Sequence, residues 1–101
     1  MILSNVLTEN EVLELEHITS SGEVSFLVLH NDDINTFDHV ISCLVEICDH
    51  ELQQAEQCAL IVHTKGKAVV KTAGQELLRP MKRALLEAGL TVTIETEKVS
   101  K

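Results

Sequence analysis

The amino-acid sequence predicts a two-layer α+β sandwich whose elements follow the order β-α-α-β-α-β. Short runs of strand-forming residues occur at 25–29, 67–71 and 90–94, and stretches with helical periodicity separate them. A chain of 101 residues, with 45% apolar and only 2% aromatic residues, can bury one modest aliphatic core. The helices are therefore expected to cover one face of a three-stranded antiparallel sheet.

The first 24 residues differ from the rest and are expected to form an N-terminal extension. Residues 8–11 (Thr-Glu-Asn-Glu) fit a capping box for a short helix ending near His17, whereas the half-alternation of residues 12–16 also fits a strand. The folded domain is expected over residues 25–97, with a polar tail at 98–101 that frays.

The first strand is expected at residues 25–29, a continuous apolar run that ends at a cluster of polar residues. Asn35 or Thr36 is a suitable N-cap for the first helix, whose apolar stripe runs through 37–48. A second helical stripe covers residues 52–62, and Gly66 is the expected C-terminal stop.

The second half of the chain is expected to supply a strand at 67–71, a turn at 72–74, a third helix and a last strand at 90–94. The stripe of the third helix ends at Gly89. Pro80 lies inside that stripe, so the helix is expected either to kink there or to begin later than Gln75.

Charge is distributed unevenly along the chain. Residues 1–64 contain twelve acidic residues and no Lys or Arg, whereas residues 65–101 contain all eight bases and four acids. This pattern disfavours nucleic acid, which needs clustered bases, and favours a cationic ligand. Three cysteines without a secretory signal, and no apolar run of membrane-spanning length, indicate reduced thiols in a cytoplasmic protein that is not bound to membrane.

Asn31, Asp32 and Asp33 form the first candidate site, at the point where a strand gives way to a helix. Their oxygens, with one imidazole nitrogen of His63, could converge on a primary ammonium group, which has three donors and no acceptor. The competing interpretation is a polar turn with a helix cap. For His63 that interpretation is a surface residue that complements a helix C-terminus.

Two other kinds of site are weaker. Cys43, Cys48, Cys58, His39 and His50 lie on or beside the first two helices, but their spacing matches no standard zinc pattern. No phosphate-binding loop, nucleophile elbow or dinucleotide motif is present, so the sequence predicts neither an enzyme nor a cofactor.

Two segments carry a resemblance to a known family. Residues 28–33 (VLHNDD) and 55–68 (AEQCALIVHTKGKA) resemble the ClpS family, the bacterial adaptors that bring N-end-rule substrates to Clp proteases. The likeness covers about residues 25–97. It implies a ClpS-like fold, similar to the C-terminal domain of the ribosomal stalk protein.

The resemblance implies a function without catalysis. Such adaptors bind proteins whose first residue is Leu, Phe, Tyr or Trp and deliver them to a AAA+ unfoldase, ClpA or ClpC, coupled to ClpP. By position, the α-ammonium group is expected at Asn31, Asp33 and His63, with Asp32 beside them. Glu76 is expected to contact the unfoldase, and the protein is expected to be a monomer. The side-chain pocket is expected from Leu29, Asn35, Phe37, Val40, Ala59, Val62 and Leu90.

Several positions depart from the family pattern. Phe37 and Ala59 stand where many members have Met, so pocket selectivity is expected to depend on this rim and wall. Asn35-Thr36 replaces a common Thr-Pro pair, and Pro80-Met81 replaces a Thr-Lys pair near the unfoldase contact. Reuse of the same fold for a different protein interaction, through residues 2–18 or the third helix, is the alternative.

Overall fold

The computed structural model describes residue 19 and residues 22–99. The expected order of elements is confirmed: β1 (Glu23–His30), α2 (Phe37–Ile47), α3 (Leu52–Lys65), β2 (Lys67–Ala73), α4 (Gln75–Glu87) and β3 (Thr91–Lys98). The short helix or strand expected before residue 18 lies outside the described residues. No helix in the described part is both long and apolar enough to cross a membrane.

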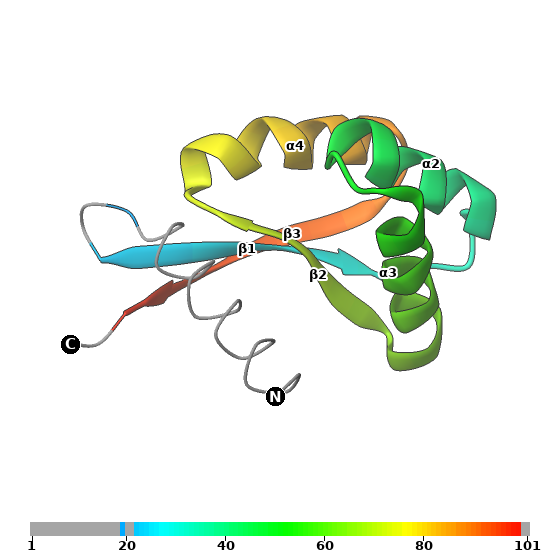
Figure 1. Ribbon diagram of the computed structural model, residues 1–101, viewed down its shortest axis with the longest axis horizontal. Helices are drawn as coiled ribbons and strands as arrows, with labels where there is room; N and C mark the ends of the chain where they lie inside the picture. Colours follow the sequence, from blue (N-terminus) through cyan, green and yellow to red (C-terminus); the bar gives the residue numbers. More distant parts are fainter. Residues whose placement is uncertain (1–18, 20–21, 100–101) are drawn as a thin grey trace.

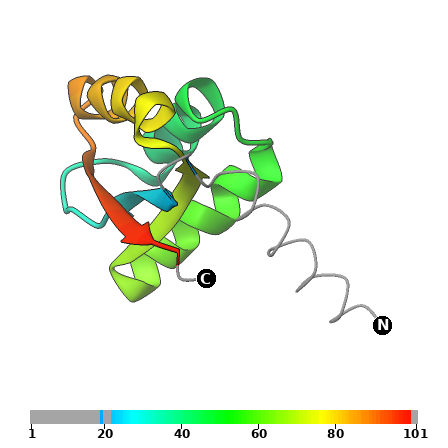
Figure 2. The same cartoon turned by 90° about the vertical axis from the view of Figure 1, so that its left-hand side faces the viewer.

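The sheet has the strand order β2-β1-β3, and both neighbours run antiparallel to the central strand β1. Figure 1 shows the sheet edge-on, with α2 and α4 above it and α3 at the end toward which β1 points. Figure 2, turned by 90°, again places α2 beside α4. The predicted antiparallel α+β sandwich is therefore the observed fold.

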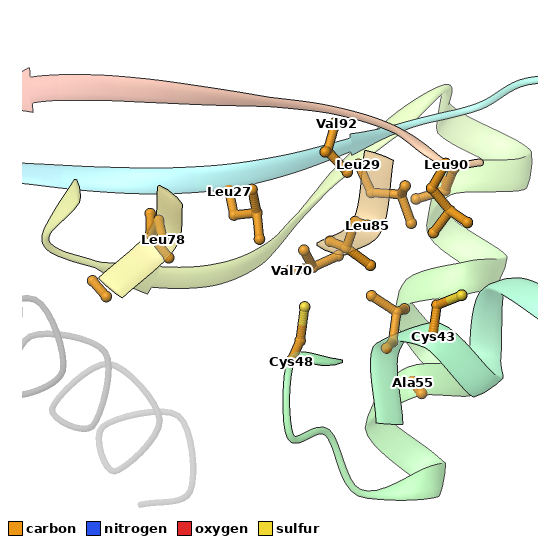
Figure 3. Close-up of a cluster of buried hydrophobic side chains, with 13 residues drawn as sticks. Leu27, Leu29, Cys43, Cys48, Ala55, Val70, Leu78, Leu85, Leu90 and Val92 are labelled. Atoms are coloured by element: carbon orange, nitrogen blue, oxygen red, sulfur yellow. The ribbon is translucent and has the colours of Figure 1, made fainter. Parts of the chain in front are cut away.

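The core lies between the helices and one face of the sheet. Alternation along β1 sends Leu27 and Leu29 to this face, where they meet Leu44 of α2 and Leu85 of α4, and all four are almost fully buried. Figure 3 shows Leu27 and Leu29 of the sheet on the same side as Leu85 of α4. Burial of each Leu stabilises the fold by about 1.5–3 kcal/mol.

The strands are longer than the apolar runs predicted. β1 begins at Glu23 rather than residue 25, and β2 continues to Ala73 through the residues expected to form a turn. The pairing of β1 with β2 shifts between Leu27 and Val28, so Val70 is an extra residue on β2 and its side chain is buried. Beyond the bulge, β2 continues past its apolar segment because Lys71, Thr72 and Ala73 pair with β1.

At the other edge, Glu97 and Lys98, expected in or next to the frayed tail, belong to β3 and pair with Val24 and Glu23. The long central strand supplies main-chain partners regardless of side-chain polarity. The prediction of a last strand at 90–94 was therefore too short, although its half-solvated character is confirmed, because Val92 is buried and its neighbours are exposed.

The helix ends follow the predicted signals with one exception. Thr36, rather than Asn35, is the N-cap of α2, and its side chain accepts from the His39 N–H at 3.1 Å. Gly66 ends α3 with φ +97°, a left-handed conformation that favours glycine. α4 begins at Gln75 and contains Pro80, so the later start was wrong. Pro80 has no amide hydrogen to donate to the carbonyl of Glu76, one helical turn earlier. Glu76 is exposed to water.

Candidate functional site

Two sequence motifs about thirty residues apart meet at one end of β1. Asn31 follows the last residue of this strand, and His63 lies in the last turn of α3, just before β2. The pairing of His30 with Lys67 and a hydrogen bond from the Asn31 N–H to the Gly66 carbonyl (2.8 Å) join the two segments. Figure 1 shows α3 and the start of α2 on the side of the molecule toward which β1 points.

A cleft of about 460 Å³ opens at this junction. It is lined by every residue predicted for the ammonium group and the side-chain pocket, and also by His30. The lining residues are Leu29, His30, Asn31, Asp32, Asp33, Asn35, Phe37, Val40, Ala59, Val62, His63 and Leu90. Glu76 lies elsewhere, on the exposed first turn of α4, where it borders a separate hollow with Gly74 and Arg79.

The mouth of the cleft carries polar side chains that remain available. Asn31, Asp33 and His63 are exposed, and among the described residues their side chains make no hydrogen bond. Each can present at least one acceptor: an amide oxygen, a carboxylate or an imidazole nitrogen. An ammonium group placed between them would meet acceptors on several sides.

The Asp32 carboxylate, in contrast, already accepts hydrogen bonds from its own loop. Its Oδ1 accepts from the main-chain N–H groups of Ile34 and Asn35, both at 3.0 Å, and from the Asn35 side-chain amide at 3.1 Å. These bonds, chiefly the one from the Asn35 backbone, lower the pKa of the Asp32 carboxyl, although burial opposes them. Asp32 therefore organises the loop that presents Asn31 and Asp33.

The interior of the cleft is apolar. Leu29, Ala59, Val62 and Leu90 are at most 5% exposed. Leu29 lies on β1 and Ala59 and Val62 lie on α3, whereas the polar mouth comes from the loop after β1 and from the last turn of α3. Phe37 stands at the start of α2 with 45% of its surface exposed. The cleft thus combines acceptors at its mouth with aliphatic walls inside.

The second candidate group does not assemble into a metal site. Among the described residues, no three His, Cys, Asp or Glu side chains lie close enough together to hold a metal ion. The buried His50 directs Nε2 to the Val70 carbonyl (2.6 Å). Burial raises the pKa of the free Cys48 thiol to about 11, which disfavours the thiolate that a metal needs.

Two contributors to this region were not predicted. His30 lines the cleft, and its Nε2 lies 2.8 Å from the Thr93 hydroxyl of β3. His39 places Nε2 2.8 Å from the Ala88 carbonyl at the end of α4. A histidine beside a helix start carries no sequence signal for such a contact, because its partner lies 49 residues away.

The chain is thus a small α+β domain with hydrogen-bond acceptors around an apolar cleft, an arrangement suited to binding a ligand. Residues 23–93 match the family described as ATP-dependent Clp protease adaptor protein ClpS. The chain therefore belongs to the ClpS family, whose members regulate Clp proteolysis as adaptors and do not catalyse it.

Individual relatives agree with this assignment. The ClpS adapter protein of Thermosynechococcus vestitus is 37% identical over 67 residues, which are 65% of this chain and 71% of that protein. ClpS of Campylobacter jejuni is 31% identical over 62 residues, 61% of this chain and 65% of that protein. The structure of Agrobacterium tumefaciens ClpS2 bound to L-phenylalaninamide matches the fold with a TM-score of 0.66 and 22% identity, over 75% of this chain and 99% of that one.

Proposed function

We propose that this adaptor binds the free N-terminus of proteins that begin with Leu, Phe, Tyr or Trp and delivers them to a Clp AAA+ unfoldase. The observation that carries the proposal is the pairing of uncommitted acceptors with an apolar interior: Asn31, Asp33 and His63 border the same cleft as Leu29 and Leu90. An N-terminal residue has the complementary pair of groups, an ammonium and a side chain on one carbon atom.

The two parts of the cleft account for useful affinity. A hydrogen bond to a charged group contributes about 1.5–3 kcal/mol, and burial of a Leu or Phe side chain contributes a similar amount. Ordering and desolvation reduce the total. An acetylated N-terminus loses its charge and leaves the acceptors at Asn31, Asp33 and His63 unpaired, so it is expected not to bind.

The similarity in fold to a solved complex also supports the proposed binding of an N-terminal residue. The Agrobacterium ClpS2 structure contains L-phenylalaninamide, and that protein shares this fold. A molecule of that kind carries a free amine next to an aromatic side chain. This chain offers acceptors and an aliphatic cleft in which the same pair of groups would fit.

Delivery requires a second surface. Glu76 is exposed on the first turn of α4, away from the cleft, where it could contact a ClpA- or ClpC-type unfoldase while a substrate is bound. We propose this role for Glu76, with the protein acting as a monomer in the cytoplasm.

The decisive test is fluorescence anisotropy with labelled peptides that differ only in the first residue, combined with an acetylated copy of the Leu peptide. Saturable binding is expected for Leu and Phe, and none for Glu or the acetylated peptide. The Asp33→Ala and His63→Ala variants should bind the Leu and Phe peptides at least about tenfold more weakly. Equal binding of Leu-, Val- and Glu-initiated peptides would refute the proposal and favour a different interaction by the same fold.

A further inference from the structure

The turn between α4 and β3 forms hydrogen bonds both with α4 and with residues in the first half of the chain. Ala88 caps α4, Gly89 adopts φ +92°, and Leu90 then enters the cleft. The N–H groups of these three residues donate back to carbonyls of α4 at 3.0–3.1 Å. The carbonyls of Ala88 and Gly89 find their partners in the first half of the chain.

Three side chains from the region between β1 and the first turns of α2 hold this turn. His39 Nε2 lies 2.8 Å from the Ala88 carbonyl, and Asn35 Nδ2 lies 2.8 Å from the Gly89 carbonyl. The Thr91 hydroxyl donates to Asp32 Oδ2 at 3.4 Å. We refer to Asp32, Asn35 and His39, with the turn of residues 88–91, as the turn clasp.

The chemistry of each bond fixes its direction. A carbonyl oxygen can only accept, so His39 carries its hydrogen on Nε2, and the Cys43 sulfur 3.6 Å away can be no more than a weak second acceptor. The Asn35 amide nitrogen faces both carboxylate oxygens of Asp32 (3.1 and 2.9 Å) and the Gly89 carbonyl. All of these are acceptors, so only the NH₂ group of Asn35 can occupy that position.

The turn clasp is connected to the cleft through one residue, Leu90. Leu90 is the only cleft-lining residue, among those described, that comes from the chain after α3; every other lining residue lies between positions 29 and 63. The clasp bonds are made on both sides of Leu90 in sequence, at residues 88, 89 and 91. Figure 3 shows Leu90 at the same end of the core as Leu29.

We infer that His39 and Asn35 are positioning residues for substrate selection: by holding the turn, they set where Leu90 stands and thus how deep the cleft is. This inference rests on the proposed binding of N-terminal residues. His39 is the sharper test of the two because it does not line the cleft, so its side chain can act on a bound residue only through the turn.

The experiment compares His39→Ala with His39→Gln, whose amide nitrogen can occupy the place of Nε2, and with Ser42→Ala, an exposed control on the same helix. Anisotropy is measured with Leu-, Phe-, Val- and acetyl-Leu-initiated peptides. Since one neutral hydrogen bond is lost, His39→Ala should weaken Leu and Phe binding by about twofold to tenfold. It should also narrow the preference for Leu over Val, while still rejecting the acetylated peptide.

A second readout needs no ligand. Amide hydrogen exchange at Leu90, whose N–H donates to the Leu85 carbonyl, should accelerate in His39→Ala and return to the parental rate in His39→Gln. Parental affinity and selectivity in His39→Ala, or a loss that His39→Gln fails to restore, would overturn the inference. Failure of the parent protein to distinguish free from acetylated peptides would instead refute the proposed function, and with it the role of the clasp in selection.

Discussion

The mouth and the interior of the cleft place opposite demands on the same short stretch of chain. Leu29 and Asn31 are two residues apart, yet Leu29 is 1% exposed and belongs to the core, whereas Asn31 is exposed and its side chain makes no hydrogen bond among the described residues. The interior is thus part of what holds the fold together. The side chains of Asn31, Asp33 and His63 at the mouth make no hydrogen bond among the described residues, so their hydrogen-bonding capacity is available to a ligand.

This comparison separates effects on stability from effects on binding. Substitutions inside the cleft should change both, because the same methyl groups pack against helices and line the cavity. Substitutions at the mouth should change binding alone.

Leu29→Ala is expected to lower the free energy of unfolding by about 2–5 kcal/mol, since it leaves a cavity at a fully packed position. Urea denaturation followed by circular dichroism measures the loss. Leu60→Ala, at a residue 49% exposed on α3, is the matched control and should cost less than about 1 kcal/mol. Similar losses for both variants would mean that the cleft interior is not part of the core.

Asp33→Ala is expected to weaken binding of a Leu-initiated peptide by about tenfold to 150-fold, because it removes a hydrogen bond to a charged group that is worth about 1.5–3 kcal/mol. Its free energy of unfolding should stay within about 0.5 kcal/mol of the parent, as for other exposed positions. Anisotropy and urea denaturation measured on the same preparation check both statements. A destabilised variant would contradict the division between mouth and interior.

Asp32→Asn should alter the pH dependence of stability. The pKa of Asp32 lies below its ordinary value of 3.8 in the folded protein, so the unfolded chain takes up the proton first as pH falls. The stabilisation from this carboxylate is therefore complete above about pH 5 and is lost as pH drops through 3.8 toward the lower folded pKa. Denaturation midpoints between about pH 2.5 and 6 should fall less steeply in the variant than in the parent. Parallel curves of midpoint against pH for the variant and the parent would argue against this stabilisation by the Asp32 carboxylate.

Phe37→Ala is expected to have the smallest effect, confined to selectivity. Phe37 is 45% exposed at the rim of the cleft, so its removal should change stability little and admit β-branched first residues such as Val and Ile. Anisotropy with Val- and Leu-initiated peptides measures the change, expected to be a few-fold. If the variant keeps the parental selectivity, Phe37 is not the gate of the pocket.

The order and type of the elements were predictable because each depends on local patterns. The apolar run of β1, the stripes of the three helices and the stop at Gly66 all act within a few residues, and all appear in the structure. The strand ends were not predictable. Val70, Glu97 and Lys98 take their places through pairing with β1, and pairing depends on residues far away in the sequence.

The sequence carried two motifs whose resemblance to the ClpS family predicted which residues border the cleft, including Asn31, Asp33 and His63. Only the tertiary structure decided which of these polar side chains are hydrogen-bonded within the protein and which are left exposed. Asp32 and Asp33 are adjacent and chemically identical, yet Asp32 is tied to Asn35 and Thr91, whereas Asp33 is left exposed. The reason is physical: a carboxylate is committed by the donors that folding brings to it. For Asp32 these are the Ile34 and Asn35 N–H groups of its own loop and, 59 residues away, the Thr91 hydroxyl.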